Sequence, residues 1–349
     1  MIDGHIHYIE YMGADRLNQI VEEYHYDGIA LQCIPDSAGR EVLGDAIRYR
    51  EQCPVPVYIF GGIRREVYRL PEDELRTALV WEARNLMTKG CTGIKMLEGK
   101  PNIRKYYPIP DFDQSVWEDY WAYLEQEQIP VYMHVNDPEE FWDASQVTEF
   151  AKKAGWFYDE TYVNNEDQYR QMQNVLERHP KLRILFPHFY FMSRQLPRLS
   201  ELLDQFENVR IDITPGSELF YNLSEDREHA IRFFEKYQDR ICYGSDIGAR
   251  VLVAEEPKLL SMEESRSRIR LITEFLETKG DYPLRPDGYY ISVTDRTMHG
   301  LGLDNKMLDK IYSENFFAFY QGRIRQKTLD KIAAAKRGRC IKNRKIIPY

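Results

Sequence analysis

Two histidines near the start of the chain have the type and spacing of a metal chelate. His5 and His7 lie in the opening stretch 1–7, which reads as a short strand. A strand places alternate side chains on one face, so both imidazoles are expected to point at one spot while Ile6 points away. Neutral imidazole is a common zinc ligand. Taken alone, the pair also fits two half-exposed polar residues, so a metal site requires further ligands.

Further candidate groups stand at the ends of other expected strands. They are Lys95, His134, His188 and Asp246. Taken singly, a histidine is often a satisfied polar residue, an aspartate after Gly-Ser is often a turn or cap residue, and a lysine often snorkels to solvent. Their joint occurrence favours a shared site, because four of the eight histidines fall at strand ends. The other four lie in helical or loop stretches and keep the ordinary interpretation: His25, His179, His229 and His299.

Short apolar runs alternate with amphipathic stretches along the chain. Strands are expected at residues 1–7, 29–34, 55–60, 91–97, 129–135, 182–188, 208–214 and 240–246. Helices are expected between them at 13–26, 40–50, 72–89, 113–128, 167–178, 195–206 and 226–237. Eight strand-then-helix units are typical of a closed (β/α)8 TIM barrel, whereas a doubly wound sheet usually stops at about five to seven strands. The pattern predicts a (β/α)8 barrel of the α/β class.

One barrel accounts for most of the chain. Residues 1–322 are expected to form it, with an aromatic insertion at 136–166, a second insertion after the eighth strand, and a final helix at 306–320. The length of 349 residues suits one such domain. The C-terminal extension 323–349 differs, with ten Lys or Arg and one acid. Such a run is usually a solvated or partner-contacting segment rather than a surface for nucleic acid or anionic lipid.

Bulk composition narrows the class of function. The chain is 43% hydrophobic and 30% charged, as in an ordinary globular protein. Its formal net charge of −9 argues against nucleic acid as a partner and favours a small molecule. Five scattered cysteines without a C-x-x-C pair favour a reducing cytoplasm. No basic segment followed by an apolar stretch opens the chain, and no apolar run reaches eighteen residues, so neither secretion nor a membrane is indicated.

The ordered set of strand-end residues resembles the amidohydrolase superfamily of metal-dependent barrels. The local motifs are similar to the amidohydrolase-related branch that includes aminocarboxymuconate semialdehyde decarboxylase. These motifs are Ile2-Asp3-Gly4-His5-Ile6-His7, Gly93-Ile94-Lys95, Pro130-Val131-Tyr132-Met133-His134, Tyr243-Gly244-Ser245-Asp246 and Ser313-Glu314-Asn315. The resemblance extends over residues 1–320 and leaves the basic extension unexplained.

The resemblance implies a role for each matching residue. The ligands of one divalent ion, zinc or alternatively manganese, would be His5, His7, His134 and Asp246, with a water completing the site. His188 would lie beside that water and exchange protons with it or with the substrate. A catalytic zinc keeps a position open and lowers the pKa of its water to about 7. Asp246 could also accept the water's proton.

Lys95 has two roles under the resemblance. In binuclear members a lysine on this strand is carboxylated and bridges two ions, and His188 would bind the second ion. In the branch resembled here one ion is the rule, and the lysine is a cation that faces the substrate. The one-ion arrangement is favoured. A buried lysine beside a metal must lower its pKa or find an anion, and a substrate carboxylate would serve.

Loops after three strands offer candidate substrate contacts. Arg64 or its neighbour Arg65 could bind a carboxylate bidentately. Aromatic residues of the later loops, including Trp142 and Tyr190, could stack on a planar acid. They could equally pack the loops onto the barrel.

The expected activity is hydrolysis of a small, carboxylated molecule by a metal-activated water, with Asp246 or His188 delivering a proton to the leaving group. The alternative is non-oxidative decarboxylation of a cyclic or unsaturated acid, because the same ligand set serves both reactions. A third interpretation is a non-catalytic metal-binding barrel. Members of the branch often form dimers, which leaves a homodimer open.

Overall fold

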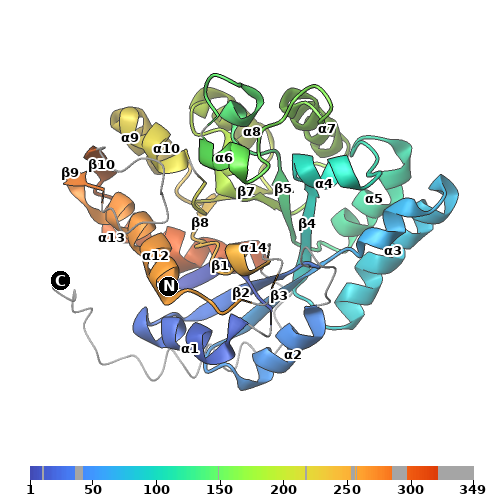
Figure 1. Cartoon of the computed structure of the whole chain (residues 1–349), viewed down its shortest axis with the longest axis horizontal. Coiled ribbons are helices and arrows are strands. Elements are labelled where there is room, and N and C mark those ends of the chain that lie inside the picture. The colour runs from blue at the N-terminus through green and yellow to red at the C-terminus, as the bar shows by residue number, and fades with distance from the viewer. Residues whose placement is uncertain are drawn as a thin grey trace.

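The computed structural model describes residues 1–9, 12–35, 42–147, 149–216, 218–252, 256, 258–284 and 297–320. This part of the chain holds an eight-stranded parallel sheet whose strands pair in chain order. The strands are β1 (Ile2–His7), β2 (Gly28–Cys33), β3 (Val57–Gly62), β4 (Gly93–Gly99), β5 (Val131–Val135), β6 (Ile184–Phe186), β7 (Val209–Asp212) and β8 (Ile241–Cys242). Helices surround them in Figure 1.

The first and last strands close the sheet. The segment after β8 forms a parallel bridge between Ile247 and Ile6 of β1. Asp246 N donates to His5 O at 2.8 Å, and Gly4 N donates to Tyr243 O at 3.1 Å. These bonds confirm the predicted (β/α)8 TIM barrel.

The outer layer is formed by helices that pack apolar faces on the strands. The main ones are α1 (Ala14–Glu23), α2 (Leu43–Gln52), α3 (Glu72–Thr88), α5 (Glu118–Gln126), α7 (Asn165–Arg178), α8 (Leu196–Gln205), α10 (Arg227–Lys236) and α12 (Met262–Glu277). On α1, for example, Leu17, Ile20 and Val21 are buried at helical spacing. The Arg266–Glu23 ion pair joins α12 to α1 and completes the ring.

Shorter elements were not all predicted. They are α4 (Pro101–Tyr106), α6 (Glu149–Lys153), α9 (Leu219–Glu225), α11 (Ala249–Leu252), the hairpin of β9 (Lys279–Pro283) and β10 (Thr297–Leu301), α13 (Asn305–Asp309) and α14 (Asn315–Tyr320). The predicted final helix 306–320 is interrupted by a π-helical turn, Lys310–Glu314. The extension 323–349 lies outside the described residues.

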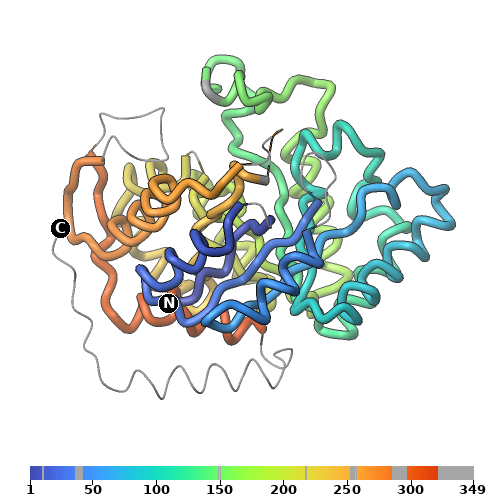
Figure 2. Tube along the Cα trace, turned by 60° about the horizontal axis from the view of Figure 1, so that its bottom comes forward, coloured from blue at the N-terminus to red at the C-terminus, as the bar shows by residue number. Residues whose placement is uncertain are grey.

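The insertion after β5 forms a small aromatic unit of its own. It includes the 3-10 turn Glu139–Trp142 and α6, and its core contains Phe141 and Tyr158. Figure 2 shows it as the green segment that projects from the barrel. Among the described residues, no helix is both long enough and apolar enough to cross a membrane.

Candidate metal centre

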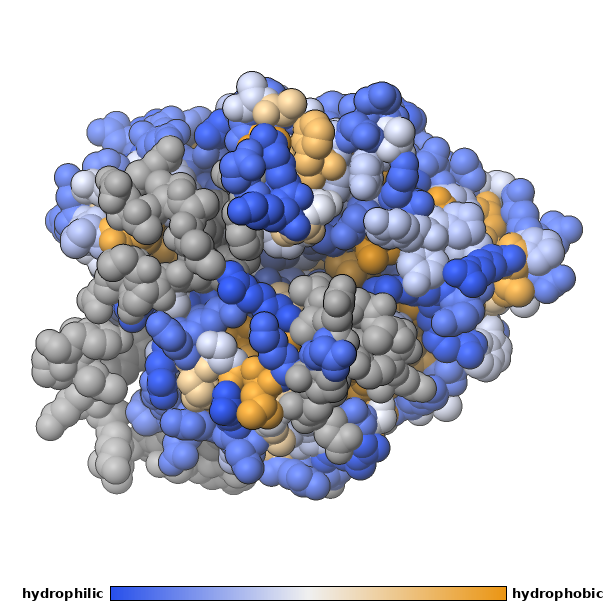
Figure 3. Space-filling view, in the orientation of Figure 1, coloured by the Kyte–Doolittle hydropathy of each residue, from blue (hydrophilic) through white to orange (hydrophobic). Residues whose placement is uncertain are grey.

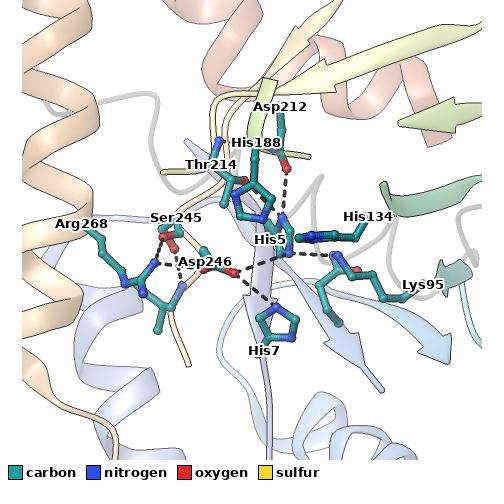
Figure 4. Close-up of polar contacts among 12 residues, drawn as sticks. His5, His7, Lys95, His134, His188, Asp212, Thr214, Ser245, Asp246 and Arg268 are labelled. Atoms are coloured by element: carbon teal, nitrogen blue, oxygen red, sulfur yellow. Dashed lines mark hydrogen bonds and ion pairs between the residues drawn. The ribbon is translucent and has the colours of Figure 1, made fainter. Parts of the chain in front are cut away.

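The two N-terminal imidazoles lie side by side, as the strand pattern predicts. His5 and His7 come from β1, are buried, and have ring centroids 5.2 Å apart. Figure 4 shows both pointing toward the side chain that follows β8, Asp246. Gly248 makes this approach feasible: it has a φ of 86°, and a Cβ there would lie 2.2 Å from His7 O. The backbone after β8 therefore packs directly against β1.

Asp246 completes a group of three donor atoms. Its Oδ1 lies 3.2 Å from His7 Nε2 and 3.7 Å from His5 Nε2. Zinc bonds of about 2.0–2.2 Å in a tetrahedron separate two ligand atoms by about 3.4 Å. The three residues fit a divalent ion, and their ligand atoms all lie within 4.8 Å of one another.

A buried arginine holds the other oxygen of this carboxylate. Arg268 on α12 donates from Nη1 to Asp246 Oδ2 at 3.0 Å and pairs with Glu264 at 3.0 Å. Burial acts to raise the pKa of Asp246, but His7 and Arg268 hold it well below its usual range. The carboxylate therefore stays ionised and keeps Oδ1 toward the imidazoles.

Lys95 enters the same group from β4. Its Nζ lies 3.1 Å from His5 Nε2, and burial lowers its pKa to about 8. The sequence places Lys95 near a strand end, whereas β4 continues to Gly99. His5 Nε2 has one lone pair, so Lys95 and a metal ion compete for it.

His188 stands on a strained turn after β6. His188–Phe191 are four successive residues with left-handed φ of 56°, 56°, 56° and 54°. For non-glycine residues this conformation costs about 1–2 kcal/mol each. Strain of this kind persists only where surrounding contacts enforce it, and it is common at functional sites. The His188 ring lies 5.7 Å from His5 and 5.2 Å from His134, centroid to centroid.

His134 is near this group but is engaged by another acid. Its Nε2 lies 3.4 Å from Asp137 Oδ1, and Asp137 also accepts hydrogen bonds from Lys100 at 2.6 Å and Tyr158 at 2.5 Å. The geometry therefore brings three of the four predicted ligands within bonding reach of one point and places His134 beside them. Tyr158 belongs to the insertion, so Asp137 also ties that unit to the barrel.

Burial keeps the histidines neutral, the form in which they bind metals. It lowers the pKa of His134 to about 4 and of His188 to about 3, and it depresses the values of His5 and His7. Among the described residues, neither His7 Nδ1 nor His188 Nδ1 has a hydrogen-bond partner, although both atoms are buried. Such groups cost about 1–3 kcal/mol each, so a ligand or water at this site would relieve them.

The predicted substrate contacts are spread over the molecule. The Arg64 guanidinium donates twice to Glu82 on α3, whereas Arg65 donates to Pro35 O and lies 5.4 Å from the Tyr107 ring. Trp142 packs on Tyr158 inside the insertion.

The aromatic turn after β6 directs its side chains to different places. Tyr190 lines a groove of about 490 Å³ between α7 and α8, outside the barrel. Its neighbour Phe191 stacks on His188 at 5.1 Å and lies 5.3 Å from His134. The aromatic wall of the site is therefore Phe191. Figure 3 shows a mostly hydrophilic face with apolar side chains in a hollow near its centre.

Three residues with direct contacts to the cluster were not among the predicted site residues: Asp137, Asp212 and Arg268. Asp212 lies on β7, with Oδ2 3.0 Å from His5 Nδ1. An acid such as Asp212, which stands between Ile211 and Ile213, indicates a buried partner, because such groups are rarely buried unpaired. The partner of Asp212 lies 207 residues away in the chain, so no spacing rule identifies it.

Together these features define a (β/α)8 barrel with a buried centre of histidines and a carboxylate at one end. The family model described as Amidohydrolase matches residues 64–320, and the chain belongs to the amidohydrolase family. His5 and His7 precede the matched region. A comparison with curated proteins gave no significant match.

Solved structures share the fold at low sequence identity. The 2,6-dihydroxybenzoate decarboxylase from Rhizobium is 12% identical with a TM-score of 0.52, over 92% of this chain and 98% of that one. A dihydroxybenzoic acid decarboxylase from Polaromonas sp. JS666, solved with manganese and the inhibitor 2-nitroresorcinol, is 11% identical with a TM-score of 0.51, over 94% and 98%. At these identities the similarity is evidence for the fold alone.

Proposed function

We propose that this chain is a metal-dependent hydrolase that acts on a small, carboxylated molecule. The observation that carries the proposal is the convergence of His5, His7 and Asp246 at the spacing of ligands on one ion, with His188 beside them. Membership of a family of metal-dependent enzymes supports it. Two imidazoles and a carboxylate suit zinc, and manganese is the alternative.

When bound, the ion would lower the pKa of a water and polarise the bond to be cleaved. His188 is the candidate proton acceptor, since its imidazole is neutral and its Nδ1 has no hydrogen-bond partner among the described residues. Asp246 is less suited to that role because its oxygens face His7 and the cationic Arg268. We assign His134 as a further ligand, which requires its ring to turn from Asp137 toward the centre.

The environment of Lys95 supports the proposal that the substrate contains a carboxylate. No acid lies within ion-pair distance of its ammonium among the described residues, and its hydrogen bond goes to His5. An ion that takes His5 Nε2 leaves this buried cation in need of an anion. A substrate carboxylate would meet that need, with Phe191 and Arg65 as candidate walls of the site; carboxylated Lys95 on a second ion remains the alternative arrangement.

Decarboxylation is the second candidate, favoured by the activity of the two decarboxylases that share the fold. It requires a protonated group to deliver a proton to carbon. His188 and Asp246 are the candidate donors of that proton, so the same side chains would serve either reaction.

The test has two parts. Purified protein is expected to hold about one equivalent of divalent ion per chain, and the His134→Ala variant much less. A folded wild type that takes up neither zinc nor manganese would overturn the metal-dependent proposal. With metal loaded, a panel of lactones, amides and ring acids separates the reactions. Incorporation of oxygen from labelled water into the product supports hydrolysis, and release of carbon dioxide without it supports decarboxylation.

A further inference from the structure

One fully buried carboxylate contacts two residues of the centre at once. Asp212 ends β7, and its side chain has no solvent exposure. Its Oδ2 lies 3.0 Å from His5 Nδ1. Its Oδ1 accepts from His188 N at 2.8 Å and from Thr214 N at 3.0 Å. Both oxygens are therefore used, and by groups from three segments of the barrel.

The contact with His5 determines the tautomer of that imidazole. The two backbone N–H groups that donate to Oδ1 favour the carboxylate form of Asp212. A carboxylate only accepts hydrogen bonds, so His5 Nδ1 carries the proton. The lone pair then resides on Nε2, the atom that lies 3.7 Å from Asp246 and 3.1 Å from Lys95. A metal ligand needs its lone pair at that atom, and a carboxylate behind a ligating histidine commonly provides this orientation.

A second group lies near the same nitrogen. Thr214 Oγ1 is 3.2 Å from His5 Nδ1 and could donate to it in the other tautomer. That arrangement would set a lone pair of His5 against the carboxylate of Asp212 at 3.0 Å, which is repulsive. The carboxylate is the closer and charged partner, so it decides the position of the proton.

The contact with His188 anchors the strained turn. The turn begins at His188, and its first amide is the one that Asp212 accepts. Further along, Tyr169 donates to Tyr190 O at 3.0 Å, and Tyr190 stacks on Phe186 at 4.0 Å. Asp212 is the anchor at the end of the turn nearest the centre.

We propose that Asp212 is a positioning residue that fixes the tautomer of His5 and the place of His188 together. The proposal rests on the proposed metal-dependent function. It predicts that one carboxylate links metal affinity to the geometry of the proton-transfer group, although it touches neither metal nor substrate.

The test uses Asp212→Asn in the full-length protein. If the amide oxygen keeps the two backbone hydrogen bonds, the NH₂ group faces His5 Nδ1 and drives the proton to Nε2. Zinc affinity, measured by competition with a chromophoric chelator, is expected to fall about 10- to 100-fold. In the metal-free variant, the nitrogen-15 chemical shifts of the His5 side chain are expected to show the Nε2–H tautomer in place of the Nδ1–H tautomer of the wild type.

Asp3→Asn is the matched control. Asp3 is equally buried and accepts from Ser245 Oγ at 2.5 Å and Tyr26 at 3.1 Å, but it meets only the backbone of His5. Its loss is expected to lower stability while zinc affinity stays within about twofold. Thr214→Val keeps the carboxylate and is expected to leave the His5 tautomer unchanged.

Two results would overturn the proposal. One is a folded Asp212→Asn protein with the zinc affinity and His5 tautomer of the wild type. The other is a wild type whose metal-free His5 carries its proton on Nε2, a measurement that decides the matter even if the variant does not fold. A wild type that binds no metal but has the Nδ1–H tautomer would count against the proposed function while supporting the positioning role.

Discussion

The two ends of the barrel interior are filled with opposite kinds of side chain. At the carboxyl end of the strands lie the imidazoles of β1 with Lys95 and Asp246, all buried. At the other end lies a set that we call the aromatic plug, which comprises Tyr58, Phe60, Tyr132, Phe316, Phe319 and Tyr320. Tyr132 borders both, with its ring 5.5 Å from His5 and 5.2 Å from Phe60.

The plug is held in place by α14, which the family resemblance marked only as a Ser-Glu-Asn motif. Asn315 donates to Gln238 O at 2.6 Å and to Ile241 O at 2.7 Å, at the start of β8. Phe316 then packs its ring 4.9 Å from Tyr58. The difference between the ends is that the plug consists of aromatic rings packed on one another, whereas the centre brings imidazoles and a carboxylate within ligand distance of one another.

The largest effect is expected from Phe316→Ala, which tests the plug. Removal of a buried phenylalanine costs about 3–5 kcal/mol through lost burial and the cavity left behind. Urea unfolding should show this loss, while zinc affinity at the other end stays within about twofold. Phe157→Ala, in the insertion, removes a ring that is 37% exposed and should cost far less. A large drop in zinc affinity for Phe316→Ala would mean that the ends are not independent.

The next effect is expected from Asp246→Asn, which tests the centre. Loss of the carboxylate removes a ligand oxygen that lies 3.2 Å from His7 Nε2. Zinc binding should weaken by more than about 100-fold, which corresponds to about 2.7 kcal/mol. Metal content after gel filtration should fall from about one equivalent to below about a tenth. Asp204→Asn on α8, where the acid pairs with Lys236 at the surface, is the control. Full metal content in Asp246→Asn would place the ion elsewhere.

The strands that carry the centre could be predicted because buried apolar runs alternate with amphipathic stretches. The pairing of His5 with His7 followed from the period of a strand. The choice of Asp246 followed from its place at the end of the eighth strand, and its role as a ligand followed from the family resemblance. The left-handed turn could not be predicted: His188 to Phe191 contains no glycine or asparagine to signal positive φ. That turn is also why Phe191, rather than its neighbour Tyr190, meets the histidines.

The residues that orient the centre could not be predicted from the sequence for a different reason. Arg268 lies on a helix in a stretch that reads as mixed helix and loop, and its pairing with Asp246 depends on how α12 packs. Asp212 depends on closure of the whole barrel to reach His5. Local patterns predict elements, whereas these contacts exist only after distant elements have assembled.

The smallest effect is expected from a change at Glu98, which tests whether every buried ionisable group near the carboxyl end belongs to the centre. Glu98 lies on β4 as Lys95 does, but it belongs to the layer beneath the helices, where its electrostatic neighbours include Tyr68 and Arg65. Burial raises its pKa, and its Oε2 has no hydrogen-bond partner among the described residues. Between the pKa values of the unfolded and folded states, the folded chain binds more protons at Glu98 than the unfolded chain does. This residue therefore lowers stability as pH rises above the ordinary glutamate value.

Glu98→Gln removes that ionisation and should flatten the fall in unfolding free energy over the pH range above the ordinary glutamate value. The gain at pH 8 should be about 1 kcal/mol, since a buried unsatisfied carboxylate is replaced by a neutral amide. Urea unfolding across this range is the measurement, and Glu201→Gln on the exposed face of α8 is the control. Zinc affinity should stay constant, because Lys95 and Glu98 lie on opposite faces of one strand. If Glu98→Gln weakened zinc binding instead, the metal centre would be coupled to buried groups on the outer, helix-facing side of β4.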